Sequence, residues 1–169
     1  TGAGIGIGRA MATAFGAAGY HVVLTDVLDA VGAEAAAGIV ASGGRAEFHR
    51  LDVRDTAGAE AIVASVTAAH GGIDVVVANA GIAHKVPLAD LTDEKWNHTL
   101  DIDLGGVMRI VRAAAPGMRE RRSGSVIAMS SIMGVAYGWN EHVHYSAAKS
   151  GVVGLVRGLA VELARDGVR

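Results

Sequence analysis

The chain has 169 residues, of which 51% are hydrophobic and 24 are glycine, and its formal net charge is −2. This length is enough for one domain with a real core, residues 1–169, and the scattered positive residues exclude the basic footprint of a nucleic-acid or membrane-surface binder. The lack of cysteine excludes disulfides and cysteine-ligated metals, and no apolar run approaches a membrane span. No signal peptide is visible, and we expect a cytoplasmic protein.

The first segment is a glycine-rich turn, Thr1 to Arg9, followed by a helical run from Ala10 to Ala18 that Gly19 closes as a C-cap. A strand from Tyr20 to Thr25 then ends in Asp26. In a dinucleotide fold, an acidic residue about 20 residues beyond the glycine turn accepts hydrogen bonds from the adenosine ribose and repels a 2′-phosphate.

The turn also places Ile5 where a phosphate-binding cation would otherwise stand. Together with Asp26, this favours NAD over NADP. The alternative is an ordinary glycine-rich turn in which Asp26 is a loop residue.

A predicted helix from Asp29 to Ser42 leads to a strand from Ala46 to Leu51, which closes on Asp52-Val53. A carboxylate at the carboxyl end of a parallel strand is placed to accept a hydrogen bond from the exocyclic amine of adenine. Equally, Asp52 is a loop residue before a helix that Asp55 caps.

The next helix spans Thr56 to His70, and a short β-branched strand from Ile73 to Val77 ends in Ala78-Asn79-Ala80-Gly81. Small residues there allow a ribose and a nicotinamide to approach the backbone, while Asn79 can tie neighbouring strand ends together.

Thr92 is a predicted N-cap for one long helix that runs towards Met118. A strand from Ser125 to Met129 follows, and its end carries Ser130-Ser131. The loop 132–144 leads into a last helix that starts at Tyr145. Strands that alternate with helices at these spacings predict an α/β fold with a doubly wound parallel sheet.

Tyr145 and Lys149 are four residues apart, so they share one face of the last helix. A tyrosine hydroxyl is normally a weak acid with a pKa of about 10, and a cation within a few ångströms favours its ionised form. This pair alone is common on helices and is a weak signal.

Four motifs in this order together resemble the short-chain dehydrogenase/reductase family, in its compact, 3-oxoacyl reductase-like form. They are the glycine turn, Asn79-Ala80-Gly81, Ser131, and Tyr145 with Lys149. The resemblance covers essentially the whole chain and implies a Rossmann-like fold. It also implies reversible hydride transfer between a nicotinamide and the carbon of a secondary alcohol or ketone.

The resemblance further implies a role for each site residue. Tyr145 would exchange a proton with the substrate oxygen, Ser131 would donate a hydrogen bond to that oxygen, and Lys149 would favour the phenolate and hold the nicotinamide ribose. The expected cofactor-binding residues are Gly2, Gly4, Ile5, Gly6, Ile7, Asp26, Asp52, Val53, Asn79, Ala80, Gly81, Tyr145 and Lys149.

Asp103 departs from the family, which commonly has an asparagine at the aligned place. That residue's main-chain carbonyl holds a water in a proton relay to the lysine, so we count Asp103 among the catalytic residues. An ionised Asp103 would compete for the ammonium of Lys149, and we expect the activity optimum to shift to higher pH.

A second departure concerns both ends of the chain. The family has a central strand before the glycine turn and further strands and a substrate lid at the other end. We expect the sheet to lack its first and its C-terminal strands, and we expect such a fragment to be poorly active or unstable because neighbouring ladder groups are left unpaired.

Other readings of the motifs are weaker. Glu141-His142-Val143-His144 resembles a metal site but lacks further ligands, so we expect none. Ser131 lacks the Gly-x-Ser-x-Gly elbow of a hydrolase, and an extended-branch epimerase or dehydratase has a different glycine spacing.

The substrate and subunit predictions rest on apolar residues. The loop that carries Met133, Val135, Ala136, Tyr137 and Trp139 suggests a hydrophobic or cyclic alcohol or ketone, and a structural loop core would look the same. Stripes through Ile110 and Leu155 predict a homodimer or homotetramer, with burial inside the monomer as the alternative. The competing function is a non-catalytic dinucleotide-binding or interaction protein on the same scaffold.

Overall fold

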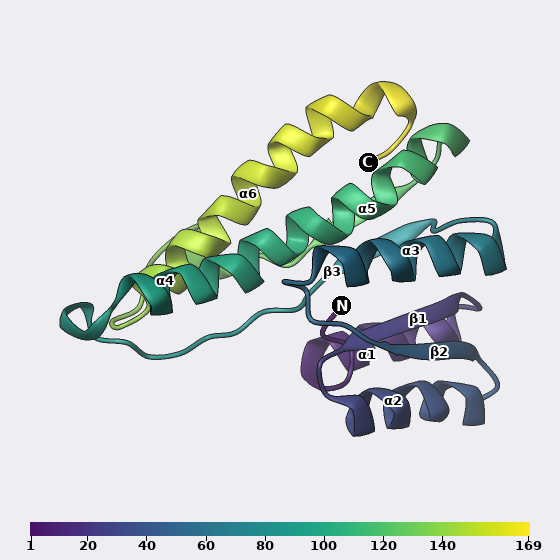
Figure 1. Ribbon diagram of the computed structural model, residues 1–169, viewed down its shortest axis with the longest axis horizontal. Coiled ribbons are helices and arrows are strands. Elements are labelled where there is room, and N and C mark those ends of the chain that lie inside the picture. The colour runs from purple at the N-terminus through teal and green to yellow at the C-terminus, as the bar shows by residue number, and fades with distance from the viewer.

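The computed structural model describes residues 1–169 and alternates helices with short strands (Figure 1). The helices are α1 (Gly6–Ala17), α2 (Asp29–Ala41), α3 (Thr56–His70), α4 (Asp93–Leu100), α5 (Gly106–Arg121) and α6 (Val143–Leu163). The strands are β1 (His21–Asp26), β2 (Arg45–Arg50), β3 (Val75–Ala78) and β4 (Ser125–Ala128). The predicted α/β class is therefore confirmed.

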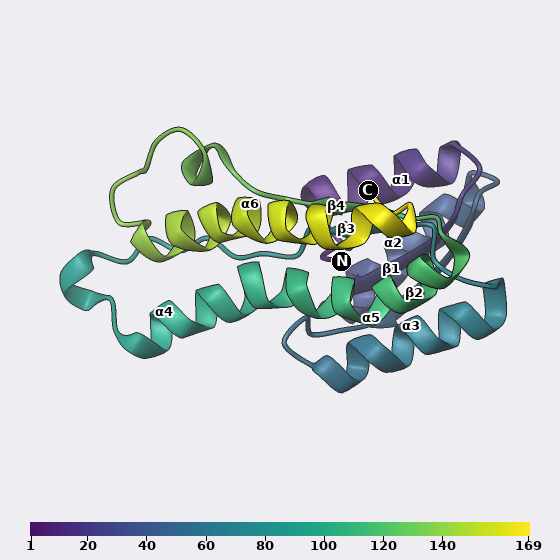
Figure 2. The same ribbon diagram turned by 90° about the horizontal axis from the view of Figure 1, so that it is seen from above.

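The first half of the molecule is built on β1 and β2, which pair in parallel from His21 opposite Arg45 to Asp26 opposite Arg50. Its core is made of small aliphatic side chains around the fully buried Leu24. Glycine permits the close packing, because a Cβ on Gly16 of α1 would lie 2.5 Å from Ile39 of α2. Figure 2 shows α1 and α3 on opposite sides of this strand pair, as a doubly wound arrangement requires.

The second half is built on β3 and β4, which are also parallel. A larger core joins them to α3, α5 and α6 and includes the fully buried Met118 and Val111. The long helices α5 and α6 lie side by side in both views (Figure 2). None of the helices combines the length and the apolar composition that crossing a membrane requires.

The expected single sheet is divided into two parallel pairs, β1–β2 and β3–β4. Only the first residues connect their carboxyl ends: the amino group of Thr1 donates to the carbonyl of Val77 at 2.8 Å, and the amide of Ala3 donates to Thr25 at 3.1 Å. A cavity of about 560 Å³ separates the two pairs. This gap lies where the sequence predicts a central strand to be missing.

The predicted long helix from Thr92 to Met118 is interrupted. A π turn, Asp101–Gly105, separates α4 from α5, and Asp103 within it is completely buried. Such turns widen the helix by one residue and are common at functional sites. Apolar periodicity continues through the turn, which is why the sequence pattern did not reveal it.

Candidate active site

The glycine turn brings the start of the chain against the end of β3. Gly2 has a positive φ of 61°, and a Cβ placed on it would lie 2.8 Å from the Cα of Ala80. A Cβ on Gly8 would lie 2.0 Å from the carbonyl oxygen of Gly2. Both positions therefore require glycine, for the backbone conformation at the first and for close approach at the second.

The amino end of α1 is left open. Its N-cap residue Ile5 provides no side-chain hydrogen bond, and the first turn contains no acidic residue. A Cβ on Gly6 would meet nothing within 4 Å, and the side chains of Ile5 and Ile7 point into solvent. The free N–H groups and the positive end of the helix dipole form a cradle that fits the pyrophosphate of a dinucleotide. The predicted loop residues Gly6 and Ile7 are thus the first turn of α1.

Asp26 closes this cradle at the end of β1. One carboxylate oxygen accepts a hydrogen bond from the amide of Gly4 at 2.9 Å, and the other accepts from the amide of Leu28 at 3.1 Å. The residue is buried. Its carboxylate is therefore held in one orientation beside the glycine turn, as a ribose-binding acid requires.

Asn79 ties the end of β3 to the glycine turn, whereas the sequence predicted that it would tie neighbouring strand ends together. Its side-chain amide donates to the carbonyls of Thr1 and Gly2, each at 3.1 Å. The hydroxyl of Thr1 accepts from the amides of Asn79 and Ala80 at 3.1 and 3.0 Å. Thr1 was not among the predicted site residues, although a hydroxyl at the start of a glycine turn is a signal that could have identified it.

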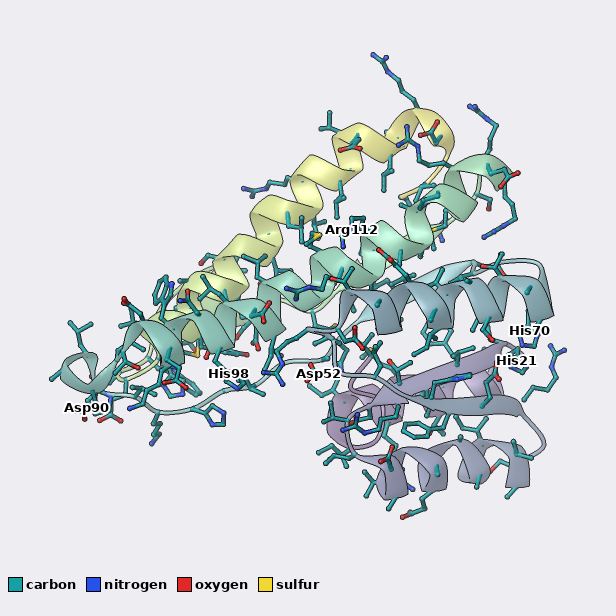
Figure 3. All side chains as sticks on the ribbon, viewed as in Figure 1. His21, Asp52, His70, Asp90, His98 and Arg112 are labelled. Carbon is teal, nitrogen blue, oxygen red and sulfur yellow. The ribbon has the colours of Figure 1, made fainter.

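Asp52 and Val53 follow the carboxyl end of β2, and Figure 3 shows Asp52 at the end of the strands away from His21 and His70. Both carboxylate oxygens of Asp52 accept hydrogen bonds from the guanidinium of Arg54. The hydrogen bonds from Arg54 lower the pKa of Asp52 and outweigh the opposing effect of its partial burial. Val53 is buried and packs against Gly106.

The ammonium of Lys149 lies at the centre of the candidate site, on the buried face of α6. It donates to the carbonyl of Met129 at 3.1 Å and lies 3.3 Å from a carboxylate oxygen of Asp103. Tyr145 is on the same helix face, with its ring centroid 5.6 Å from the Lys149 nitrogen. The π turn, the end of β4 and α6 therefore converge on one cation.

Gly81 completes this convergence. A Cβ placed on it would lie 3.1 Å from both the Lys149 nitrogen and the carboxylate of Asp103. The other carboxylate oxygen of Asp103 accepts a hydrogen bond from the amide of Ile82 at 2.8 Å. The predicted strand-end motif and the predicted catalytic residues are thus in contact.

Burial raises the pKa of Asp103, and the hydrogen bond from Ile82 and the charge of Lys149 only partly oppose this rise. Burial also lowers the pKa of the nearby His144, the more so because its neighbours His142 and His84 carry potential positive charge. The lowered pKa keeps His144 uncharged near neutral pH. Lys149 is therefore the cation in contact with Asp103.

Ser131 caps the short 3-10 turn Ile132–Gly134 at the end of β4, and its hydroxyl accepts from the amide of Met133 at 3.2 Å. This turn is held on α6: the hydroxyl of Ser130 donates to the carbonyl of Lys149 at 2.7 Å, and that of Ser150 donates to Gly134 at 3.0 Å. Ser131 is therefore fixed near Lys149 through its neighbours. Ser130 has this positioning contact, which the sequence alone did not indicate.

Rings from the loop before α6 continue up to Tyr145. His142 lies edge-on to Tyr145 at 6.3 Å between centroids, and Trp139 lies edge-on to His142 at 6.2 Å. The nitrogen Nδ1 of His142 is 2.8 Å from the carbonyl oxygen of Asn140, so this nitrogen is already used in a hydrogen bond within the loop.

A hollow of about 1050 Å³ is lined by Arg54 and by residues of α4, the π turn, α5 and α6, and contains none of the predicted site residues. Ile110 is buried in the second core, and Leu155 packs against that core. Burial within the chain therefore accounts for both stripe residues that suggested a subunit contact.

Known proteins are similar to this chain in sequence and in fold. A family model described as short chain dehydrogenase matches residues 1–169. A Mycobacterium tuberculosis protein named (5R,7aS)-5-hydroxy-7a-methyl-1-oxo-2,3,5,6,7,7a-hexahydro-1H-indene-carboxyl-CoA reductase is 41% identical over 99% of this chain and 64% of its own length. The 3-oxoacyl-[acyl-carrier-protein] reductase FabG of Escherichia coli is 34% identical over 99% of this chain and 67% of its own.

A solved structure is similar as well. The crystal structure of a metagenomic short-chain oxidoreductase in complex with NADP superimposes with a TM-score of 0.94 at 35% identity, over 99% of this chain and 76% of the other. The chain thus spans about two thirds of the length of the curated relatives it matches. Its fold is Rossmann-like, and the chain belongs to the short-chain dehydrogenase/reductase family.

Proposed function

We propose that this sequence belongs to an oxidoreductase that moves a hydride between a nicotinamide dinucleotide and a secondary alcohol or ketone. The observation that carries the proposal is the placement of Lys149, whose buried ammonium is held by Met129 and Asp103 beside Tyr145. A buried cation next to a phenol favours the phenolate and so makes proton exchange near neutral pH possible.

Each of the three catalytic residues has its own role in the proposed reaction. Tyr145 exchanges a proton with the substrate oxygen, and Ser131 donates a hydrogen bond to the same oxygen as its charge changes. Lys149 would hold the ribose of a bound nicotinamide dinucleotide, and its positive charge lies beside the Tyr145 ring. The cofactor, when bound, supplies or accepts the hydride.

Asp103 is a positioning residue in this scheme. Its carboxylate holds the amide of Ile82 and shares the ammonium of Lys149, which leaves less of that charge for Tyr145. We expect Asp103→Asn to remain active with its optimum at lower pH than the parent. Superimposable pH–rate profiles would contradict this competition.

The preferred cofactor is NAD. Asp26 fixes a carboxylate beside the glycine turn, where it would repel a 2′-phosphate, and Ile5 is not a cation. Arg9, the nearest basic residue in the turn, is paired with Glu34 at 2.9 Å. Because one structural neighbour is an NADP complex, both cofactors belong in the test.

The substrate is a hydrophobic or cyclic alcohol or ketone. Val135, Tyr137 and Trp139 expose apolar surface on the loop between Ser131 and Tyr145, whereas Met133 is buried. Apolar walls with few polar groups are typical of sites for such molecules. The bicyclic compound in the name of the mycobacterial relative is of this class.

The test is reduction of NAD⁺ and of NADP⁺, followed by absorbance, with a panel of cyclic and linear secondary alcohols. We expect turnover with NAD⁺ and a loss of about 10²- to 10⁴-fold in Tyr145→Phe, since a general acid/base contributes about that much. Tyr20→Phe, whose exposed ring precedes β1 and is not among the predicted site residues, serves as the matched control.

The second candidate function is dinucleotide binding without catalysis, because the pair between Asp103 and Lys149 occupies the ammonium that catalysis needs. Saturable NAD binding with no turnover in the parent or in Asp103→Asn would favour it. Cytoplasmic location and a homodimeric or homotetrameric state stay predictions.

A further inference from the structure

A second polar cluster lies at the opposite end of the strands from Lys149. His21 is the first residue of β1, Glu47 lies in β2, and His70 is the last residue of α3. Figure 3 shows His21 and His70 together where β1 begins and α3 ends, away from Asp52 at the other end of β2. No residue of the proposed reaction takes part in this cluster.

The three side chains converge on one point. Nε2 of His21 is 3.3 Å and Nε2 of His70 is 3.2 Å from the same carboxylate oxygen of Glu47. The two imidazole rings lie 4.1 Å apart between centroids, and the three ligand atoms are all within 4.8 Å of one another. Ligands of a tetrahedral metal at 2.0–2.1 Å are separated by about 3.3 Å, which both measured nitrogen–oxygen separations match.

The charges also suit a cation. Partial burial acts to raise the pKa of Glu47, but the hydrogen bonds from His21 and His70 and the proximity of His49 outweigh it and leave the pKa lowered. All ion-pair partners of Glu47 are histidines, so no lysine or arginine neutralises it permanently. A carboxylate with two neutral imidazoles is a donor set that Zn²⁺ accepts.

His49 supports the carboxylate from the other side. Its Nε2 lies 3.3 Å from the second oxygen of Glu47 but outside hydrogen-bonding geometry, and this nitrogen is buried without another partner. A small rotation of Glu47 towards an ion would change this contact. Second-sphere groups of this kind orient ligating carboxylates.

The cluster is accessible. The four side chains retain between 28 and 36% of their exposure. His21 and His70 also line the cavity between the two strand pairs. An ion could reach the site from solvent and keep a water as its fourth ligand.

We propose that His21, Glu47 and His70 form a binding site for Zn²⁺ or a similar borderline divalent ion, and that His49 orients Glu47. The ion joins the start of β1, the middle of β2 and the end of α3. Because it binds the folded chain and not the unfolded one, it stabilises this end of the molecule in proportion to its concentration.

The experiment is a calorimetric titration of the purified, tag-free protein with Zn²⁺ after treatment with a chelator, repeated with Co²⁺ followed by visible absorption. We expect one site per chain and a tetrahedral Co²⁺ spectrum in the parent. His70→Gln should bind more than 10-fold more weakly, and His49→Gln about 10-fold more weakly. His98→Gln, an exposed histidine of α4 outside the cluster, should match the parent.

Circular dichroism confirms that each variant is folded, and Glu47→Gln provides a second variant if His70→Gln does not fold. Parent-like Zn²⁺ affinity in a folded ligand variant would overturn the site, as would the lack of saturable binding in the parent. Catalytic assays do not enter this test, so it is independent of the proposed oxidoreductase activity.

Discussion

Two ionic clusters of this molecule place similar groups in different surroundings. Lys149 and Asp103 retain 5% and 0% of their side-chain exposure, whereas Glu47 and its histidines keep roughly a third. In the first cluster each polar group needs its partner, because water cannot replace it. In the second cluster the side chains are partly exposed, so water competes with the contacts of His21 and His70 and these groups can exchange partners for protons or an ion.

The largest expected effect is on stability at the buried cluster. Asp103→Ala leaves the ammonium of Lys149 without its carboxylate and the amide of Ile82 without its acceptor. We expect the free energy of unfolding to fall by about 3 to 5 kcal/mol, as measured by urea denaturation. The control is Asp29→Ala, which breaks an exposed pair with Arg50 and should cost less than about 1 kcal/mol. Equal losses would remove the distinction between the clusters.

The pH dependence of stability should differ in sign between the clusters. The pKa of Asp103 is raised above 3.8, so the native state retains a proton that the unfolded chain has lost. Its contribution to the free energy of unfolding is therefore largest below pH 3.8 and declines as the pH rises through the native pKa. Asp103→Asn does not titrate, and we expect the parent to lose stability relative to this variant over that window. A constant difference from pH 3 to pH 8 would contradict the raised pKa.

The smallest effect is expected at Glu47. Its pKa is lowered below 4.5, so it contributes stability that is fully present above pH 4.5 and is lost as the pH falls through the native pKa. In the presence of a chelator, Glu47→Gln should lower the free energy of unfolding by no more than about 1 kcal/mol at neutral pH, because solvent screens the cluster. The difference should disappear in acid. A loss as large as that of Asp103→Ala would show that exposure does not separate the two clusters.

The sequence predicted features that depend on neighbouring residues more accurately than features that depend on residues far apart in the chain. The helix from Thr56 to His70 was predicted with its observed bounds, since Asp55 caps it and Gly71 ends it with a left-handed backbone. The glycine turn, Asn79 and the pair of Tyr145 and Lys149 are also local patterns. The π turn at Asp103 was missed because it leaves the apolar periodicity of its helix intact.

Contacts between distant segments were beyond the sequence patterns. The hydroxyl of Thr1 meets amides 78 and 79 residues further along the chain, and Glu47 meets His21 and His70 across 26 and 23 residues. Sequence separations between contacting residues follow no periodic pattern. The sequence around a histidine on a strand is therefore the same whether or not distant residues contact it.

The sequence by itself determined the alternation of strands and helices, the glycine-rich turn and the residue types available for proton exchange, because these depend on backbone preferences and spacings within one element. Only the tertiary structure decided that Asp103 and Lys149 share one buried contact beside Gly81 and that three histidines surround Glu47. Packing of β3, β4 and α6 excludes water from the first group, and the pairing of β1 with β2 beside α3 brings the second together. Burial and proximity are properties of the fold, and they set the strength of every charge interaction in both clusters.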